Sequence, residues 1–416
     1  MISVARLNEN FRRLAAIGAQ PGGGITRLAF GDADWAAREF IMALMQAAGL
    51  TIRLDAFGNI LGRREGLAPA APAVLLGSHI DSVPNGGNYD GVAGVLAAIE
   101  ICRCLAARGE HHYHPIEVVV FMAEESSRFG MATLGSKAFC GKLSSDQLEQ
   151  YRDGDGISLA AALRQRGLIP EKIGNARYPG AIKAFLELHI EQGKVLEAME
   201  RQIGVVTGIA APTRLKVVMT GQADHSGATP MHLRQDALTA AAEVILLVEK
   251  LAGQEGHNGT VGTTGIVKAE PGVMNVIPGR VELGIDIRSI SAGSKQRVLD
   301  QLSAGMAAIA SCRGVAVEII TLTDETPVEI SREMVEFLDN IAGESGYSHM
   351  RLPSGAGHDA MHLAEIAPTG MLFVPCRGGI SHNPAESAST EDIAAAAEVL
   401  LTAVGRLAQQ DFILNT

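Results

Sequence analysis

Short apolar runs alternate with helical patterns along much of the chain. Apolar runs bounded by turn residues are typical of buried strands, and they occur at residues 73–76, 116–121, 184–190 and 371–374. The hydrophobic spacing predicts helices at residues 92–105, between the first two runs, and at residues 393–407. A strand, a helix and a second strand in this order are the repeating unit of an α/β fold. We therefore predict a mostly parallel sheet flanked by helices.

The pattern changes between residues 211 and 326. Apolar and polar residues alternate at 215–219, 281–285 and 315–319, as in strands with one exposed face, and helical patterns lie near 234–252 and 293–312. This combination of strand and helix patterns predicts an α+β domain inserted into a larger one. The expected boundaries are residues 1–210 and 327–416 for a discontinuous main domain and residues 211–326 for the insert.

Composition narrows the class of protein. A chain of 416 residues with 47% hydrophobic and 19% charged residues is typical of a globular protein of about two domains. The net charge of -11 argues against a nucleic-acid partner, which needs a clustered basic surface. No apolar stretch reaches the roughly 20 residues that span a membrane. Five scattered cysteines without a CxxC pair indicate neither a disulfide framework nor a zinc knuckle. We expect a soluble, cytoplasmic protein.

Residues of the types that commonly bind metal ions follow several of the predicted strands. Five short segments, GSHIDS, NYDG, AEES, LHIEQG and SHNP, contain the candidate ligands His79, Asp90, Glu125, His189 and His382. Each segment alone is weak evidence, because single histidines and acidic loops are common in proteins. Together they form a mixed nitrogen and oxygen set that suits Zn²⁺ or Mn²⁺.

Three of these segments allow more than one interpretation. His79 and Asp81 point to the same side of an extended segment, so Asp81 could orient a metal-bound His79, although a structural histidine is the simpler alternative. Asp90 could cap the following helix or bridge two metals. The adjacent carboxylates of Glu124 and Glu125 could form a solvated loop, or they could serve as a general base and a metal ligand.

These motifs resemble the hydantoinase/carbamoylase branch of the M20 metallopeptidase-like family over nearly the whole chain. GSHIDS, NGGNYDG, ELHIEQG, DHSGATPM, NVIPG, DIRS, SGAGHDA and GISHNPAE occur in the family's order. The resemblance implies a two-metal site in which His79 and His189 hold the first ion, Glu125 and His382 hold the second, and Asp90 bridges them.

The resemblance also assigns further roles. Glu124 would be the general base, with Asp81 supporting the site, and the insert would be a mobile lid that forms a homodimer. The implied substrate residues are His225, Asn275 and Arg288 from the insert and Gln192, Gly357 and His358 from the main domain. A planar guanidinium suits a substrate carboxylate, although a surface ion pair is the alternative for Arg288. The imidazole of His225 suits hydrogen bonding to an oxyanion.

The implied activity is hydrolysis of small N-carbamoyl-L-amino acids to the L-amino acid, carbon dioxide and ammonia. A hydroxide bridging two divalent ions, Zn²⁺ or Mn²⁺ with Co²⁺ or Ni²⁺ as alternatives, would attack the ureido carbon. The alternatives are allantoate amidohydrolase, an N-acyl-amino-acid hydrolase or dipeptidase, and a noncatalytic binding protein. Allantoate-specific members often have Gly-Gln-Arg where this chain has Ala211-Pro212-Thr213. The apolar Pro212 favours N-carbamoyl amino acids.

Overall fold

The structure, a computed structural model, describes residues 1–412 and divides into two compact units. Unit 1 comprises Met1–Thr207, Ile330–Leu352 and the chain from His358 onward. Unit 2 comprises Gly208–Glu329 and the short return segment Pro353–Gly357. Gly357, which the sequence assigned to the main domain, therefore groups with unit 2.

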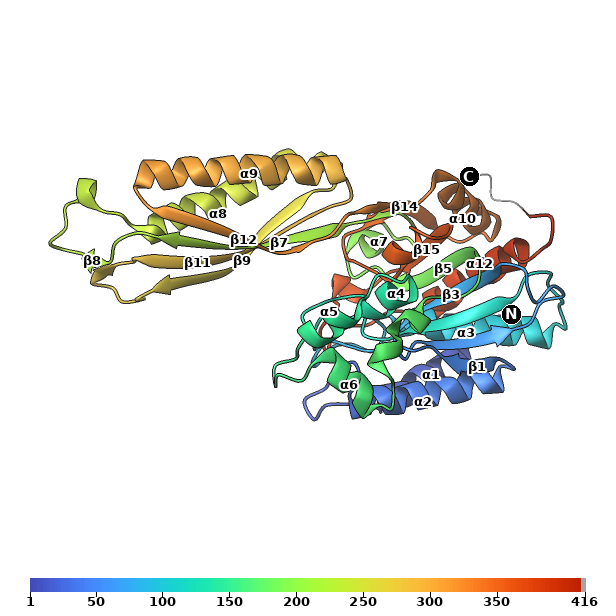
Figure 1. Cartoon of the computed structure of the whole chain (residues 1–416). Helices are drawn as coiled ribbons and strands as arrows, with labels where there is room; N and C mark the ends of the chain where they lie inside the picture. Colours follow the sequence, from blue (N-terminus) through green and yellow to red (C-terminus); the bar gives the residue numbers. More distant parts are fainter. Residues whose placement is uncertain (413–416) are drawn as a thin grey trace. The chain divides into compact units, whose positions relative to one another are not determined.

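A mixed sheet forms the centre of the main fold (Figure 1). Its strands follow the order β1 (Thr51–Leu54), β2 (Ile60–Arg64), β4 (Ile116–Phe121), β3 (Ala73–His79), β5 (Ile182–Ile190), β15 (Thr369–Val374), β6 (Ile203–Ile209) and β13 (Val328–Glu329), and β14 (His349–Ser354) also pairs with β6.

The prediction of a mostly parallel sheet is wrong for the outer strands. The four central strands β4, β3, β5 and β15 pair in parallel, whereas β1, β2, β6 and β13 pair antiparallel. Long crossover connections permit parallel pairing, and short turns such as the one between β1 and β2 impose antiparallel pairing. Apolar runs identify strands but carry no information on their direction.

Helix α3 (Val92–Ala107) connects β3 to β4 and is buried on nearly every side. Its apolar sequence follows from this burial, because a helix without a solvent face needs no polar stripe. A Cβ atom at Gly94 would lie 2.2 Å from the carbonyl oxygen of Leu188. The glycine therefore permits close packing of α3 against β5, the strand that carries His189.

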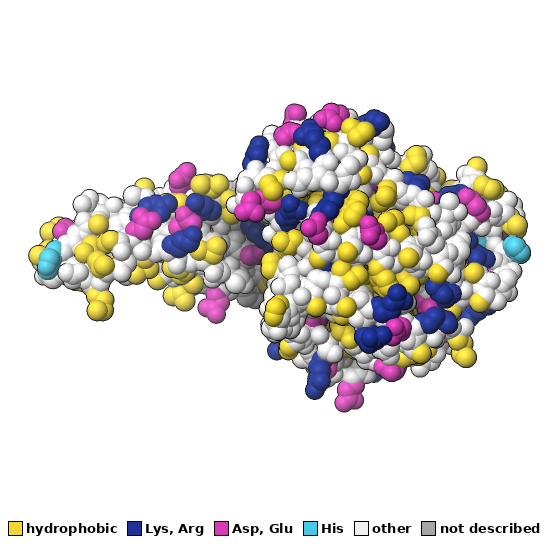
Figure 2. Space-filling view, turned by 90° about the horizontal axis from the view of Figure 1, so that it is seen from below, with side chains coloured by type: hydrophobic (Ala, Val, Ile, Leu, Met, Phe, Trp, Pro, Cys, Tyr) yellow, Lys and Arg dark blue, Asp and Glu magenta, His cyan; other side chains and the backbone are white. Residues whose placement is uncertain are grey.

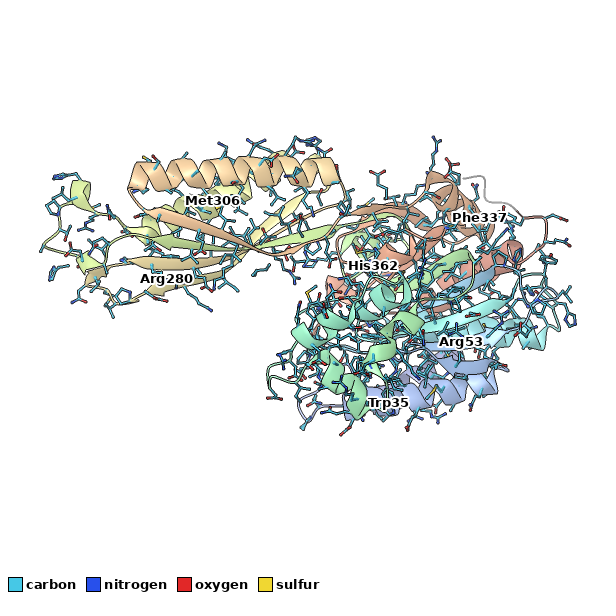
Figure 3. All side chains as sticks on the ribbon, viewed as in Figure 1. Trp35, Arg53, Arg280, Met306, Phe337 and His362 are labelled. Atoms are coloured by element: carbon cyan, nitrogen blue, oxygen red, sulfur yellow. The ribbon has the colours of Figure 1, made fainter. Side chains whose placement is uncertain are left out.

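The remaining helices of unit 1 surround this core. They are α1 (Val4–Ala15), α2 (Asp32–Ala47), α4 (Leu134–Phe139), α5 (Ser145–Gln150), α6 (Leu159–Gln165), α7 (Val195–Ala198), α10 (Arg332–Glu344), α11 (Ala360–Leu363) and α12 (Thr390–Leu407). Ser389 caps α12 by accepting the backbone N–H of Asp392 at 3.2 Å. On α11, His362 (Figure 3) lies 2.9 Å from the hydroxyl of Thr133.

Unit 2 has its own sheet and its own core. Antiparallel strands follow the order β12 (Ala316–Asp324), β7 (Ala211–Thr220), β11 (Arg280–Ser289) and β9 (Val261–Glu270). Helices α8 (Ala237–Gln254) and α9 (Ala292–Arg313) cover one face (Figure 1). Every second residue of β11 is buried, and Met306 of α9 (Figure 3) packs in the same core. A separate pair, β8 (Asp224–His225) and β10 (Val276–Ile277), completes the unit.

On the face drawn in Figure 2, basic side chains lie among acidic and hydrophobic ones and do not cover a continuous area. None of the helices within residues 1–412 combines the length and the apolar character that crossing a bilayer requires.

Candidate metal centre

Two histidines from neighbouring strands face one carboxylate oxygen. His79 is the last residue of β3, and His189 lies one residue before the end of β5. Asp90 Oδ1 lies 3.4 Å from His79 Nε2 and 3.2 Å from His189 Nε2. Because β3 and β5 pair in parallel, these ends meet at one edge of the sheet. Open α/β sheets bind their ligands at this edge.

The other oxygen of Asp90 faces a separate pair of side chains. Asp90 Oδ2 lies 3.3 Å from His382 Nε2, and the same nitrogen lies 3.3 Å from Glu125 Oε1. In each of these two groups the ligand atoms lie within 4.8 Å of one another. One carboxylate therefore directs its two oxygens at two different sets of ligand atoms, as a residue that bridges two cations must.

Hydrogen bonds fix which nitrogen of each histidine faces Asp90. His189 Nδ1 lies 2.9 Å from the carbonyl oxygen of Ile190, and His79 Nδ1 lies 3.1 Å from the carbonyl oxygen of Asp81. A carbonyl can only accept, so both Nδ1 atoms donate, and in the neutral imidazole each Nε2 atom keeps its lone pair. The Nε2 lone pair is the one that a metal needs.

Gly91 makes room for the first group. Its φ is +64°, and a Cβ atom there would lie 2.5 Å from His79 Nε2. Its backbone N–H donates to His189 Nε2 at 3.1 Å. Gly91 is also the N-cap of α3, where no side chain caps the helix, so Asp90 does not have the capping role that the sequence left open.

The carboxylate of Asp81 holds the loop that follows β4. It accepts the backbone N–H of Glu124 at 3.2 Å and that of Glu125 at 3.0 Å. Its Oδ1 lies 3.6 Å from His79 Nδ1, farther than the Asp81 carbonyl oxygen. Glu124 Oε2 lies 3.7 Å from His79 Nε2 and is a member of neither ligand group. A buried carboxylate beside the ligands, and outside their set, is suited to proton transfer.

The charge of the site favours bound cations. Among the described residues, the ion pairs of Asp90 and Glu125 are all with histidines. Burial raises the pKa of Glu124 well above its usual range, and it raises the pKa of Glu125 as well. Burial alone would lower the pKa of His79, but the nearby carboxylates raise it overall. Buried carboxylates are costly without compensating charge, so the residues fit a pair of divalent cations.

Three residues around the site have backbone conformations that side chains rarely adopt. Ala123, Gln192 and His382 have φ values of +57°, +57° and +53°. Such conformations cost on the order of 1 kcal/mol or more, and they persist where the surrounding structure enforces them. The side-chain Nε2 of Gln192 donates to Asp90 Oδ2 at 2.6 Å and lies 3.3 Å from His382 Nε2.

A second layer of buried polar residues lies behind His189. The ring of His358, a predicted substrate residue, packs edge-on against that of His189 with centroids 4.5 Å apart. Glu187 lies two residues before His189 on β5. Its carboxylate accepts the hydroxyl of Ser78 at 2.7 Å and the backbone N–H of Ala360 at 3.1 Å. The sequence interpretation missed Glu187, although an acidic residue inside an apolar strand was a usable signal.

Two predicted substrate residues are neighbours in unit 2. β8 carries His225, which pairs with Val276, the residue after Asn275. The ring nitrogen Nδ1 of His225 accepts the backbone N–H groups of Gly227 at 3.0 Å and Ala228 at 3.1 Å. The ring proton therefore lies on Nε2, and the exposed imidazole presents a donor, as an oxyanion requires.

Arg288 is held by an acidic residue of its own strand. Its Nε lies 2.9 Å from Asp286 Oδ1, and its Nη1 lies 3.4 Å from the carbonyl oxygen of Gly355. Arg214 on β7 approaches the other Asp286 oxygen at 3.0 Å. Arg288 thus forms an ion pair, the alternative that the sequence left open, and Asp286 orients its guanidinium.

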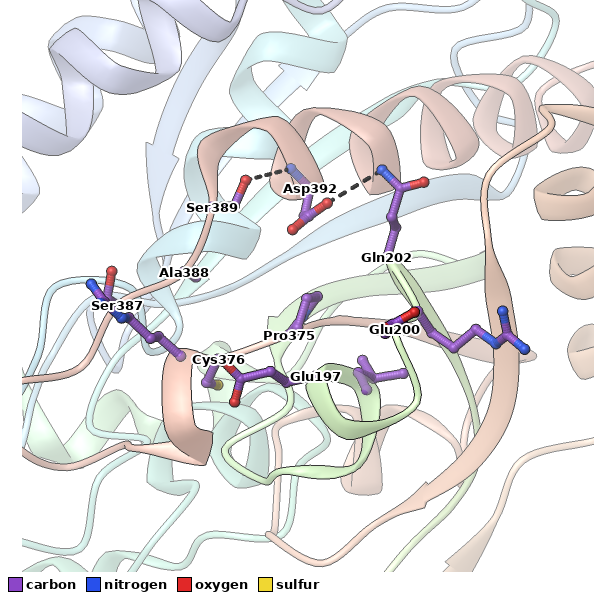
Figure 4. Close-up of a pocket in the computed structure, with 12 residues that line it drawn as sticks. Glu197, Glu200, Gln202, Pro375, Cys376, Ser387, Ala388, Ser389 and Asp392 are labelled. Carbon is purple, nitrogen blue, oxygen red and sulfur yellow. Dashed lines mark hydrogen bonds between the residues drawn. The ribbon is translucent and has the colours of Figure 1, made fainter.

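Two pockets in unit 1 are lined by residues other than the predicted ligands. One of about 420 Å³ adjoins Asp32, Arg128, Asp153 and Arg166. The other, of about 430 Å³, is shown in Figure 4 and is lined by residues between Leu196 and Gln202 and by others between Pro375 and Asp392.

Known proteins are similar to nearly the whole chain. Residues 75–406 match Peptidase family M20/M25/M40. The N-carbamoyl-L-amino acid amidohydrolase of Geobacillus stearothermophilus is 44% identical over 98% of this chain and 100% of its own. The allantoate amidohydrolase of Escherichia coli (strain K12) is 36% identical over 97% of this chain and 98% of its own.

A solved structure agrees with the sequence relatives. An amidase of the hydantoinase/carbamoylase family from Burkholderia multivorans superposes with a TM-score of 0.90 at 38% identity, covering 99% of both chains. At such identity and coverage the likeness extends beyond the fold. The chain belongs to Peptidase family M20/M25/M40 and, within it, to the hydantoinase/carbamoylase branch.

Proposed function

We propose that this protein is a metal-dependent amidohydrolase that converts N-carbamoyl-L-amino acids to L-amino acids, carbon dioxide and ammonia. The observation that carries the proposal is the position of Asp90, with Oδ1 facing His79 and His189 and Oδ2 facing His382. A binding protein has no need for Glu124 beside such a site, whereas a hydrolase requires a proton carrier there.

Five side chains would hold two divalent cations: His79, Asp90, Glu125, His189 and His382. The chemistry that such ions supply is polarisation of a carbonyl group and a lowered pKa of water. Glu124 would accept the proton of the attacking water and transfer it to the departing amino nitrogen. The Nε2–H of His225 would donate to the oxyanion. The released carbamate decomposes to carbon dioxide and ammonia.

The surroundings of Arg288 support a substrate with one ureido group. In the sheet register Arg288 lies directly opposite Pro212. An apolar proline next to the carboxylate-binding guanidinium offers nothing to the second ureido group of allantoate. We therefore favour N-carbamoyl-L-amino acids over allantoate, although a relative that shares 36% of the sequence is named for allantoate.

We further propose that unit 2 forms a homodimer and acts as a lid. Both edge strands of its sheet expose apolar side chains: Val261 of β9 is 57% exposed and Leu322 of β12 is 58% exposed. Uncovered strand edges with apolar residues tend to pair with other chains. In such a dimer His225 of one subunit would serve the site of the other.

The five free cysteines are consistent with a reducing cytoplasm.

The substrate class can be tested directly. Metal-loaded enzyme should be incubated in parallel with N-carbamoyl-L-amino acids, allantoate and N-acetyl-L-amino acids, and both ammonia and free amine should be quantified. We expect equal amounts of ammonia and L-amino acid from the first class and much slower reaction of the other two. Turnover restricted to N-acetyl substrates, without ammonia, would contradict the proposal.

A further inference from the structure

The loop that carries His382 is closed at its base. Cys376 and Ala388 form an isolated antiparallel bridge, and the backbone N–H of Arg377 donates to the carbonyl oxygen of Ser387 at 2.8 Å. We call the segment 376–388 the His382 loop. The pocket in Figure 4 lies against this base. The base fixes where the loop begins and ends, but His382 lies in its middle, beyond the reach of these contacts.

A buried glutamate of the same loop reaches the segment that carries Asp90. Glu386 is 6% exposed, and its Oε1 accepts the backbone N–H of Tyr89 at 2.8 Å and that of Asp90 at 3.1 Å. Its Oε2 accepts the hydroxyl of Ser381 at 2.9 Å. Ser381 immediately precedes His382. One carboxylate thus joins two segments that lie almost 300 residues apart in the chain (296 residues for Asp90 and Glu386).

The fit around Glu386 leaves little freedom. A Cβ atom at Gly87 would lie 2.1 Å from Glu386 Oε1 and 2.4 Å from its Cβ. The hydroxyl of Ser381 also lies 3.0 Å from Asp90 Oδ2, the oxygen that faces His382. The contacts of Glu386 therefore reach two of the three members of the second group: Asp90 directly and His382 through Ser381.

The hydrogen bonds of Glu386 do not by themselves require a negative charge. Its three hydrogen-bond donors are neutral groups, and the Asp90 carboxylate lies nearby. In a Glu386→Gln variant, the amide oxygen could accept the same two backbone N–H groups, and the NH₂ group could point at Ser381.

We propose that Glu386 is a positioning residue that sets the separation between Asp90 and His382 and thereby the affinity for the second cation. The inference rests on the proposed two-metal function. Glu386 itself touches neither substrate nor metal in this account. It acts through the backbone of Asp90 and through Ser381, as outer residues that orient metal ligands commonly do.

The test measures metal binding and not turnover. Metal-free wild type, Glu386→Ala and Glu386→Gln are titrated with Mn²⁺ by calorimetry, and their thermal unfolding is recorded without metal. We expect Glu386→Ala to weaken one of the two Mn²⁺ sites on the order of 10–100-fold. Glu386→Gln should stay within about threefold of wild type, because the amide can keep the hydrogen bonds.

A matched control separates positioning from general destabilisation. Glu100 is also buried at 2% exposure and accepts the backbone N–H of Ser3 at 3.0 Å. Glu100→Ala should lower stability yet bind Mn²⁺ like wild type. If Glu386→Ala does not fold, Ser381→Ala replaces it and should weaken the second site at least threefold.

Three results would overturn the inference. The first is unchanged Mn²⁺ affinity in the folded Glu386→Ala variant, or in Ser381→Ala where that variant replaces it. The second is an equal loss of Mn²⁺ affinity in Glu100→Ala, and the third is a loss in Glu386→Gln as large as in Glu386→Ala. A wild-type chain that binds no Mn²⁺ would instead contradict the proposed function, so the two failures are distinguishable.

Discussion

Asp90 shows how the role of a residue depends on its surroundings. An aspartate before a helix ordinarily caps the helix by accepting backbone N–H groups. Here Gly91 takes the N-cap position, and the two Asp90 oxygens face histidines from three different segments. The neighbouring pair Glu124 and Glu125 is divided in a similar way, because only Glu125 belongs to a ligand group.

This division predicts different effects for two similar substitutions. Glu124→Gln should retain two metal ions and lose activity on the order of 10²-fold or more, because the proton carrier is removed. Glu125→Gln should lose metal, because an amide is a poorer ligand than a carboxylate. Metal content by elemental analysis and turnover are measured on the same samples. Equal metal loss in both variants would show that the two roles are wrongly assigned.

Gly91 provides a second test with a close control. A Cβ atom at Gly91 would strike the His79 ring, whereas Gly109 has the same φ of +64° and open space around it. Both alanine variants should lose on the order of 1 kcal/mol or more of stability from the positive φ, and Gly91→Ala should lose more, because its ψ of -43° lies outside the left-handed helical region. Only Gly91→Ala should also weaken metal binding, on the order of tenfold or more. Equal Mn²⁺ affinity in the two variants would count against the predicted position of His79.

At the level of strands and helices, the sequence predicted the parts that bury continuous apolar runs. β4 has the predicted bounds, and α3 and β5 extend the predicted segments by a few residues. The short helices between Leu134 and Gln165 have too few turns to show a periodicity, and they were not predicted. Strand direction depends on pairing between distant segments, so the mixed sheet could not be deduced from local pattern.

The site, like the fold, was predicted in part: the candidate ligands were identified, and a residue that contacts them was not. The proposed metal ligands are chemically distinctive residues at strand ends, and the structure brings them together in two groups. Glu386 was missed, although it lies in the quoted stretch GISHNPAE. Its partners are backbone N–H groups of a distant segment, and nothing in the local sequence of either segment indicates that contact.

Strand β11 carries a prediction about substrate binding. Asp286 orients Arg288, so Asp286→Asn should lower kcat/KM about tenfold, and Arg288→Ala should lower it on the order of 10²-fold, as for charged hydrogen bonds. Adding Asp286→Asn to Arg288→Ala should cost little more, because the two act as one unit. Arg280→Ala, at the other end of β11 (Figure 3), should leave kcat/KM unchanged. Simple addition of the two losses would refute the coupling.

At the scale of the whole molecule, the site residues predicted from the sequence are distributed over both units. The candidate ligands belong to unit 1, and the predicted substrate residues His225, Asn275 and Arg288 belong to unit 2. Each unit has its own core, as expected for parts that can move as separate bodies. A lid that closes over the metals would exclude water and strengthen the charged contacts.

If the lid serves the partner's site, two inactive variants should complement each other. His225→Ala and Glu124→Gln homodimers should each be nearly inactive. After mixing and exchange of subunits, one site in each mixed dimer has both intact residues, and activity should return to a measurable fraction of wild type. Mass spectrometry or differential tagging verifies that mixed dimers form. Mixed dimers that form and remain inactive would refute the shared site.

The central claim is that two divalent ions at the Asp90 site drive hydrolysis of a ureido group. The most direct measurement is titration of the metal-free protein with Mn²⁺ while ammonia release from an N-carbamoyl-L-amino acid is recorded. We predict no turnover without metal and a rise that ends at two ions per chain, with one ammonia for each amino acid. Full turnover by protein that elemental analysis shows to be free of metal would contradict the account.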